Sequence, residues 1–282
     1  MLAGRKLSNA AGSASLAIGR RQFLVLAAAV PAIAVDVPER RRKVETVFKS
    51  PGPKPNGLQA TAEGLWILDQ GDNRAYLVDY KDGRVLRALD TDSKAGSGIT
   101  FDGEAIWIAS TYSREIIRAD ARTGKTLAKY DTPGAGVVKW TDKEARRSPL
   151  APPAQPRPAG EAKKGSGQRQ ATGAHGLEWR DGKLWISCPP AMKIYRMNPP
   201  AWKVEFEFPT AGNRPHGIGW DGDFLWCADS NLNGFFKHDP KTGRILEKIQ
   251  LADRDPLPHG MTIWQGWMWY CDDVGVVCRL KM

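Results

Sequence analysis

Beyond its first 34 residues, the sequence lacks an apolar run long enough to span a bilayer, so we expect no transmembrane segment there. Acidic residues are also fewer than basic ones: 31 Asp and Glu against 41 Lys and Arg, a formal net charge of +10. Such a surplus indicates nucleic-acid binding when it forms a basic helix or a basic and aromatic platform. Neither arrangement is present, so we interpret the charge as a solvated surface and expect no nucleic-acid partner.

Residues 1–34 contain no Asp or Glu and have the order of an export signal. The pair Arg20-Arg21 precedes an apolar run from Phe23 to Val30, and Ala32-Ile33-Ala34 is a small-x-small cleavage site. This order resembles the twin-arginine signals that carry folded proteins across a membrane. A Sec signal or an uncleaved anchor is the alternative. We therefore predict a periplasmic or secreted protein whose fold begins near Val35.

Five copies of one frame organise the rest of the chain. In each copy a Gly is followed nine residues later by a Trp in an apolar run. The pairs are Gly57 and Trp66, Gly98 and Trp107, Gly176 and Trp185, Gly217 and Trp226, and Gly260 and Trp269. A repeat of this length indicates a propeller or a solenoid.

Each copy reads as four short strands. Asp-Gly turns such as Asp102-Gly103 close the first hairpin, and Asp-x-x-x-Gly turns such as Asp239–Gly243 precede the fourth strand. The last copy ends at Met282 without a fourth strand, whereas Val44–Phe48 is a strand with no copy of its own. We therefore predict an all-β, five-bladed β-propeller over residues 44–282, with four-stranded blades and a ring closed by the N-terminal strand. The repeat tryptophans are expected to pack between neighbouring blades.

One spacing is irregular. Gly98 and Gly176 are 78 residues apart, whereas the other successive repeat glycines are separated by 41 to 43 residues. The excess lies in 141–172, a segment rich in proline and basic residues that has no strand pattern. Such segments bury too little apolar surface to order alone. We predict a disordered insert that emerges on the face where the first strands of the blades begin and acts as a mobile lid or tether.

Polar side chains occupy two repeat positions that should form two rings on that same face. The residues before each Gly are Asn56, Ser97, His175, His216 and His259. The residues three after each Trp are Asp69, Ser110, Cys188, Asp229 and Asp272. Three of the four histidines thus share one position in successive blades, and we interpret the fourth, His238, as a surface residue.

Three converging imidazoles suit a divalent metal. His175, His216 and His259, with Asn56 or water, are the predicted ligands, and Zn, Fe, Mn and Ni all remain possible. Asp229 or Asp272 could orient a histidine or act as a base. Two alternatives stay open: the histidines cap loops, or the rim binds a ligand or transfers protons without a metal.

The frame Pro215–Ile218 followed by Leu225–Asp229 resembles the repeats of virginiamycin B lyase, also called streptogramin lyase. That resemblance implies a magnesium-dependent pair of a histidine and an acid, matched here by His216 with Asp229 and by His259 with Asp272. The lyase family has Glu where this chain has Asp, and seven blades where we count five.

The repeats are also similar to those of two other propeller families. Gluconolactonase and regucalcin place metal ligands before such a Gly, which implies ligand roles for Asn56, His175, His216 and His259. That family has six blades and prefers Asn, Asp and Glu at this position. Plant-type glutaminyl cyclotransferases resemble the chain in repeat style and have the blade number predicted here.

The four cysteines are Cys188, Cys227, Cys271 and Cys278, and an exported chain permits disulfides. Cys271 and Cys278 lie on adjoining predicted strands and could pair. Cys188 belongs to the second ring, where it is either a buried apolar residue or a ligand or nucleophile.

The sequence therefore predicts a metal-assisted enzyme of lyase, lactonase or cyclotransferase type that acts on a small polar molecule. The predicted catalytic residues are His216, Asp229, His259 and Asp272. The alternative is a non-catalytic propeller that binds a ligand or a protein, because propellers support many functions. The sequence leaves the oligomeric state open.

Overall fold

The computed structural model describes residues 37–152 and 170–282. The predicted export signal and residues 153–169 of the insert lie outside the described residues. In the described ranges the elements are strands, apart from the short 3-10 helix η1 (Pro199–Ala201). No helix in these ranges is long and apolar enough to cross a membrane.

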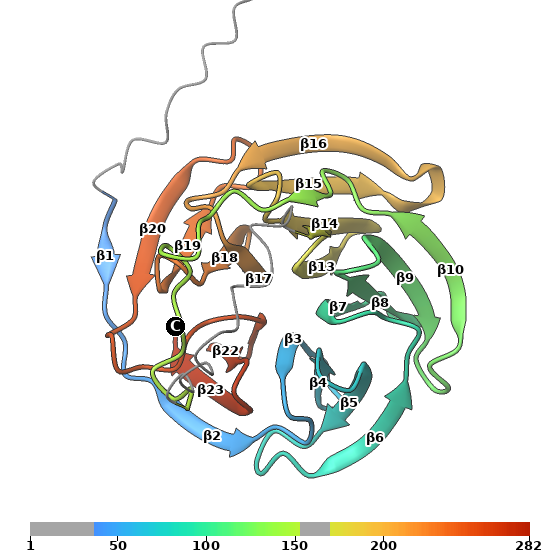
Figure 1. The fold of residues 1–282 in the computed structure, drawn as a ribbon, viewed down its shortest axis with the longest axis horizontal. Coiled ribbons are helices and arrows are strands. Elements are labelled where there is room, and N and C mark those ends of the chain that lie inside the picture. Colours follow the sequence, from blue (N-terminus) through green and yellow to red (C-terminus); the bar gives the residue numbers. More distant parts are fainter. Residues whose placement is uncertain (1–36, 153–169) are drawn as a thin grey trace, which may run out of the picture. The chain divides into compact units, whose positions relative to one another are not determined.

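Five four-stranded antiparallel sheets are arranged radially around a central axis, as Figure 1 shows. Blade one contains β3 (Pro55–Ala60), β4 (Leu65–Asp69), β5 (Arg74–Val78) and β6 (Val85–Asp90). Blade two contains β7 (Gly96–Phe101), β8 (Ala105–Ser110), β9 (Glu115–Asp120) and β10 (Thr126–Asp131). Blade three contains β13 (Gly176–Arg180), β14 (Lys183–Cys188), β15 (Lys193–Asn198) and β16 (Lys203–Pro209).

Blade four contains β17 (Pro215–Asp221), β18 (Phe224–Asp229), β19 (Gly234–His238) and β20 (Ile245–Gln250). Blade five contains β21 (Met261–Trp264), β22 (Trp267–Asp272) and β23 (Val276–Lys281), and its outer strand is β2 (Glu45–Lys49). The prediction of a five-bladed propeller with four-stranded blades is therefore confirmed.

The N-terminal part of the described chain closes the ring, as predicted. β2 pairs antiparallel with β23, with Glu45 opposite Arg279 and Lys49 opposite Val276. The short strand β1 (Glu39–Arg40), which the sequence did not predict, pairs in parallel with β20 of blade four (Figure 1). The chain thus spans the junction between blades four and five before the first blade begins.

The repeat tryptophans are buried in the cores between blades, also as predicted, and none is more than 5% exposed. Trp66 of blade one, for example, packs in one cluster with Ile99 and Ile117 of blade two. The indole of each repeat tryptophan also lies near a basic side chain of its own blade. The pairs are Arg87 with Trp66, Arg118 with Trp107, Arg196 with Trp185, Lys237 with Trp226, and Arg279 with Trp269.

Close packing of the inner strands explains why the frame contains Gly. A Cβ atom at Gly176 would lie 2.1 Å from the His216 carbonyl oxygen of the next blade, and one at Gly217 would lie 2.1 Å from the Met261 nitrogen. A Cβ at Gly260 would lie 2.6 Å from the Asn56 carbonyl oxygen, which continues the ring back to blade one. Five blades enclose so narrow an axis that neighbouring inner backbones touch.

The interpretation of His238 as a surface residue is wrong, because its side chain is fully buried. His238 ends β19, and its Nδ1 lies 3.1 Å from the Gly243 carbonyl oxygen. Its ring packs against Phe208 on β16 of blade three, with ring centroids 5.3 Å apart. The sequence does not reveal that this side chain faces the space between two blades.

The suggested Cys271–Cys278 disulfide is also wrong, since all four cysteines are free and buried. Cys271 pairs with Val277 across the two strands, whereas Cys278 pairs with Tyr270. Side chains alternate between the faces of a sheet, so the two thiols lie in different core clusters.

The described flanks of the insert lie on the predicted face. β11 (Gly136–Val137) pairs with β12 (Ala171–Thr172), and residues 138–152, which we call the strap, continue from there. The strap reaches blades four and five, where Arg146 contacts Asn231 and Ser148 contacts Asp272. In Figure 1 this light-green segment leaves β10 and crosses toward β23. The disorder predicted for the insert, 141–172, stays a prediction for 153–169, whereas β12 and the contacts of Arg146 and Ser148 order the described parts of it.

Candidate functional site

The predicted metal ligands meet at one cavity. Asn56, His175, His216 and His259 all line a cavity of about 360 Å³ at one mouth of the propeller. Each comes from or next to the innermost strand of a different blade. The strap adds Trp140 to the same lining. The structure therefore brings together side chains that are up to 203 residues apart in the sequence.

The three imidazoles stand edge to face in a row. The ring centroids of His175 and His216 are 4.7 Å apart, and those of His216 and His259 are 4.6 Å apart. His175 Nδ1 lies 3.1 Å from His216 Nε2, a hydrogen-bond distance. His216 and His259 are almost completely buried, whereas His175 is half-buried.

Backbone carbonyls determine which nitrogens carry hydrogen. His216 Nδ1 lies 3.0 Å from the Arg214 carbonyl oxygen, which can only accept, so Nδ1 is the protonated nitrogen. Ser230 Oγ, also 3.0 Å from this nitrogen, donates its own hydrogen to the Pro258 carbonyl oxygen. His216 Nε2 must then accept from His175 Nδ1–H. His175 Nε2 is left with a free lone pair, buried and without a partner among the described residues.

All three imidazoles are neutral near pH 7. Burial lowers the pKa of His175 to about 3, and the positive charge of Arg214 contributes. Burial also lowers the pKa of His259 to about 4, although the Asp273 carboxylate acts in the opposite direction. For His216, burial and the neighbouring imidazoles move the pKa well below its ordinary value. Neutral imidazoles keep the lone pairs that accept protons or bind metals.

Asp229 contacts backbone amides instead of a histidine. Its Oδ2 accepts from the Arg214 amide at 3.0 Å, and its Oδ1 accepts from the Asn231 and Leu232 amides at 3.0 and 2.9 Å. Asp69 occupies the equivalent place in blade one and likewise binds backbone amides, among them that of Lys54. This ring position therefore fixes the loop that carries the mouth residue of the same blade.

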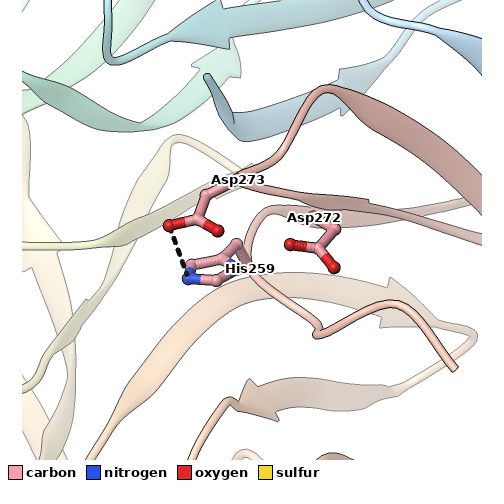
Figure 2. A group of neighbouring side chains, drawn as sticks. All are labelled: His259, Asp272 and Asp273. Carbon is pink, nitrogen blue, oxygen red and sulfur yellow. Dashed lines mark ion pairs between the residues drawn. The ribbon is translucent and has the colours of Figure 1, made fainter. Parts of the chain in front are cut away.

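Asp272 differs because it belongs to a potential metal site with His259 and Asp273, shown in Figure 2. One ligand atom from each residue lies within 4.8 Å of the others, and His259 Nε2 is 3.8 Å from Asp273 Oδ2. This is the one such group of His, Cys, Asp or Glu in residues 37–152 and 170–282. The three histidines do not present three nitrogens at such distances.

One oxygen of the Asp272 carboxylate accepts hydrogen bonds and the other has no partner among the described residues. Oδ2 accepts from Ser148 Oγ at 2.6 Å and from the Leu257 amide at 2.7 Å. Oδ1 is buried and has no hydrogen-bond partner among the described residues. Burial and the like charge of Asp273 raise the pKa of Asp272 to about 6. A cation would satisfy the spare oxygen and offset this repulsion.

Two residues of the mouth were missed at the level of the sequence. Asp273 directly follows Asp272, whereas Asp69 and Asp229 of the other blades are followed by Gln70 and Ser230. The second aspartate of the last copy was therefore a signal that the sequence offered. Arg214 stands just before Pro215-His216, and nothing in the pattern shows that its side chain lines the cavity. Cys188 is buried, and burial raises the pKa of its thiol to about 12, which opposes a role as a nucleophile.

No protein-family model matches this sequence, and neither does any curated protein. Among solved structures, the glutaminyl cyclase of Myxococcus xanthus is 10% identical with a TM-score of 0.61, over 86% of this chain and 97% of that one.

Virginiamycin B lyase from Staphylococcus aureus is 17% identical with a TM-score of 0.48, over 85% of this chain and 99% of the lyase. A catalytically inactive variant of it with quinupristin is 18% identical with a TM-score of 0.46, over 83% and 68%. The resemblance to glutaminyl cyclotransferases is confirmed at the level of the fold, and the chain is a five-bladed β-propeller similar in fold to a glutaminyl cyclase.

Proposed function

We propose that this protein is an exported enzyme that transfers protons on a small polar molecule bound at the mouth, with the help of a divalent cation. The observation that carries the proposal is the directed hydrogen-bond chain from His175 through His216 to the Arg214 carbonyl oxygen. It leaves His175 Nε2 as a buried, unpartnered acceptor on a side chain that lines the cavity. Export rests on the pattern of residues 1–34.

His175 serves as the base in this proposal. When Nε2 takes a proton from the substrate, Nδ1–H can pass its own proton to His216 Nε2, and the Arg214 carbonyl oxygen then stabilises the His216 imidazolium. The low pKa of His175 has three causes: burial, which is the largest, then the charge of Arg214 and that of His259. A substrate that neutralises Arg214 removes the second cause and makes His175 a stronger base.

His259, Asp272 and Asp273 would hold the cation. One imidazole nitrogen and two carboxylates suit Mn²⁺, Zn²⁺ or Mg²⁺, and the spare Asp272 Oδ1 fits a ligand role. A cation there would polarise a carbonyl oxygen of the substrate. Of the ligands predicted from the sequence, this set retains only His259. His175 and His216 are not included because they form a hydrogen bond with each other, and Asn56 is replaced by the two aspartates.

Lyase, lactonase and cyclotransferase reactions all use a base near a polarised carbonyl. We place the cyclotransferase type first because a glutaminyl cyclase shares the fold. The test is turnover of three substrates: a peptide with N-terminal glutamine, followed by ammonia release; a γ-lactone, followed by acid release; and a cyclic depsipeptide, followed by mass.

We expect His175→Gln to lower turnover by about 100-fold, the usual contribution of a general base. His238→Gln is the matched control, because His238 lies outside the mouth and should leave turnover within a few-fold of wild type. Unchanged turnover in His175→Gln contradicts the assigned base. Absence of turnover and of any retained metal in the wild type would favour the non-catalytic propeller.

A metal measurement is independent of turnover. After dialysis against Mn²⁺ and then buffer, elemental analysis should find about one ion per chain in the wild type and in His175→Gln. Asp273→Asn removes a charged ligand and should retain far less. Equal retention by Asp273→Asn would place the ion elsewhere.

A further inference from the structure

Four of the 14 buried polar side-chain atoms without a hydrogen-bond partner in the described residues belong to residues that line the mouth. Asn56 Oδ1, Thr172 Oγ1, His175 Nε2 and Arg214 Nε are all buried without a hydrogen-bond partner in the described part of the chain. All four residues line the same cavity. Buried polar groups are almost always paired in folded proteins, so a group of exceptions around one cavity indicates a polar ligand.

Arg214 is the cation of this group, and contacts from three sides position it. Its backbone amide donates to Asp229, and its Nη1 donates to the Arg146 carbonyl oxygen of the strap at 2.9 Å. The guanidinium lies 5.7 Å from the centre of the Trp140 ring. Loop, strap and indole therefore fix a planar cation at the wall of the cavity.

This cation has no counter-ion of its own in residues 37–152 and 170–282. Asp273 and Asp229 act on Arg214 through space, but neither forms an ion pair with it within 4.0 Å. Arg214 is partly buried, and a charge withdrawn from water without a partner is costly, so proteins rarely retain one without a use. Guanidinium groups match carboxylates because two parallel N–H groups meet two oxygens.

We propose that the mouth selects small carboxylates that carry a hydroxyl or amino group close to the carboxylate. The carboxylate pairs with Arg214, and Lys54 adds positive charge at the same cavity, which Asp142 and Asp273 also line. Asn56 Oδ1, which accepts only, takes a hydrogen from the neighbouring hydroxyl or amine. The cavity of about 360 Å³ lies at the small end of ligand sites. This inference rests on the proposed function and narrows its substrates to molecules with a free carboxylate, such as free L-glutamine for the cyclotransferase type.

The test is calorimetric titration with L-lactate, glycine and acetate, with acetamide as the neutral match and inorganic phosphate as a second kind of anion. We expect lactate or glycine to bind more tightly than acetate, and acetamide not to bind. Arg214→Gln should weaken lactate binding by about 10- to 100-fold, and Arg214→Lys by less, because lysine keeps the charge but not the fork. Arg84→Gln, an exposed arginine, is the control.

Melting temperatures check that each Arg214 variant is folded, and Arg214→Lys provides the second variant if Arg214→Gln is not. Lactate binding that survives both substitutions overturns the inference, as does phosphate binding with no preference for carboxylates over acetamide. Different variants test the two proposals: His175→Gln tests the proposed function, and the Arg214 variants test this inference. Lactate binding that depends on Arg214, without turnover of any substrate, leaves this inference standing while the proposed function fails. If neutral substrates are turned over equally well by wild type and Arg214→Gln, the proposed function stands and this inference fails.

Discussion

Backbone carbonyls orient two of the imidazoles, and a proline makes this possible. His216 Nδ1 lies 3.0 Å from the Arg214 carbonyl oxygen and His259 Nδ1 lies 3.4 Å from that of Leu257. In both cases the carbonyl is two residues earlier and a proline stands between. Proline restricts φ and has no N–H to compete for the carbonyl. Each imidazole is therefore protonated at Nδ1, which leaves Nε2 as the acceptor.

Glu178 is a second kind of buried polar residue, outside the mouth. It lies on β13 and interacts with Gln59 and Thr100 of blades one and two, which are themselves joined by a 2.7 Å hydrogen bond. Burial raises the pKa of Glu178 to about 8. The side chain is therefore a neutral carboxylic acid at pH 7, which suits a fully buried position between inner strands.

This raised pKa predicts a pH-dependent stability. The folded pKa exceeds the unfolded value, so the folded state binds the proton more tightly. The stabilisation is complete below about pH 4.5 and is lost as the pH rises through about 8. Glu178→Gln is neutral at every pH and should gain stability relative to wild type between pH 5 and pH 9, measured by urea denaturation.

The gain is limited to about 1.4 kcal/mol for each unit of pKa shift. Glu63→Gln, an exposed acid, is the control and should show no such trend. A constant difference between Glu178→Gln and wild type across this range would mean that Glu178 ionises normally.

At the scale of the strands, contact between inner backbones limits what the ring can tolerate. A methyl group at Gly217 would overlap the Met261 amide of β21 and force blades four and five apart. We expect Gly217→Ala to lower the free energy of unfolding by about 3 kcal/mol or more, by overpacking at a place where only backbone can move. Thermal and urea denaturation provide the measurement.

Gly136→Ala is the matched control, because a Cβ there meets only Pro190 Cβ at 3.8 Å, an ordinary contact. It should change stability by less than about 1 kcal/mol. If the two substitutions cost the same, close contact between inner strands does not explain the Gly of the frame.

The elements were predictable because their signals are local. The Gly and Trp frame, the Asp-Gly turns and the unassigned strand at Val44–Phe48 contain enough information to count blades and to close the ring. Three features were not predictable from local signals: the pairing of β1 with β20, the burial of His238 and the separation of Cys271 from Cys278. Each depends on contacts between blades or on which face of a strand points inward.

At the scale of the whole molecule, the ring explains what could be predicted of the candidate site. Radial symmetry brings one repeat position from every blade to one axis, so the gathering of His175, His216 and His259 follows from the repeat alone. The positions of Arg214 and Asp273 do not, because they depend on the strap and on one doubled acid. The irregular part of the chain thus distinguishes this mouth from the general pattern of its repeats.

The strap joins the connection between blades two and three to blade five, and Ser148 is its buried contact. Ser148 Oγ donates to Asp272 at 2.6 Å, and its oxygen also accepts from the Leu150 amide at 3.0 Å. Ser148→Ala leaves the Asp272 carboxylate with one donor fewer in a buried place. We expect a loss of about 1–3 kcal/mol in the free energy of unfolding, whereas Ser148→Thr keeps the hydroxyl and should recover most of it.

Limited proteolysis distinguishes a local effect from release of the strap. Residues 141–152 should resist cleavage in the wild type, because Ser148 and Arg146 fix them to Asp272 and to Asn231 and Asp253. In Ser148→Ala, cleavage after Arg146 or Arg147 should become faster, and Arg214 should lose its contact with the Arg146 carbonyl oxygen. Equal cleavage rates in both proteins would mean that the strap is held by its other contacts, and that the mouth keeps its wall without Ser148.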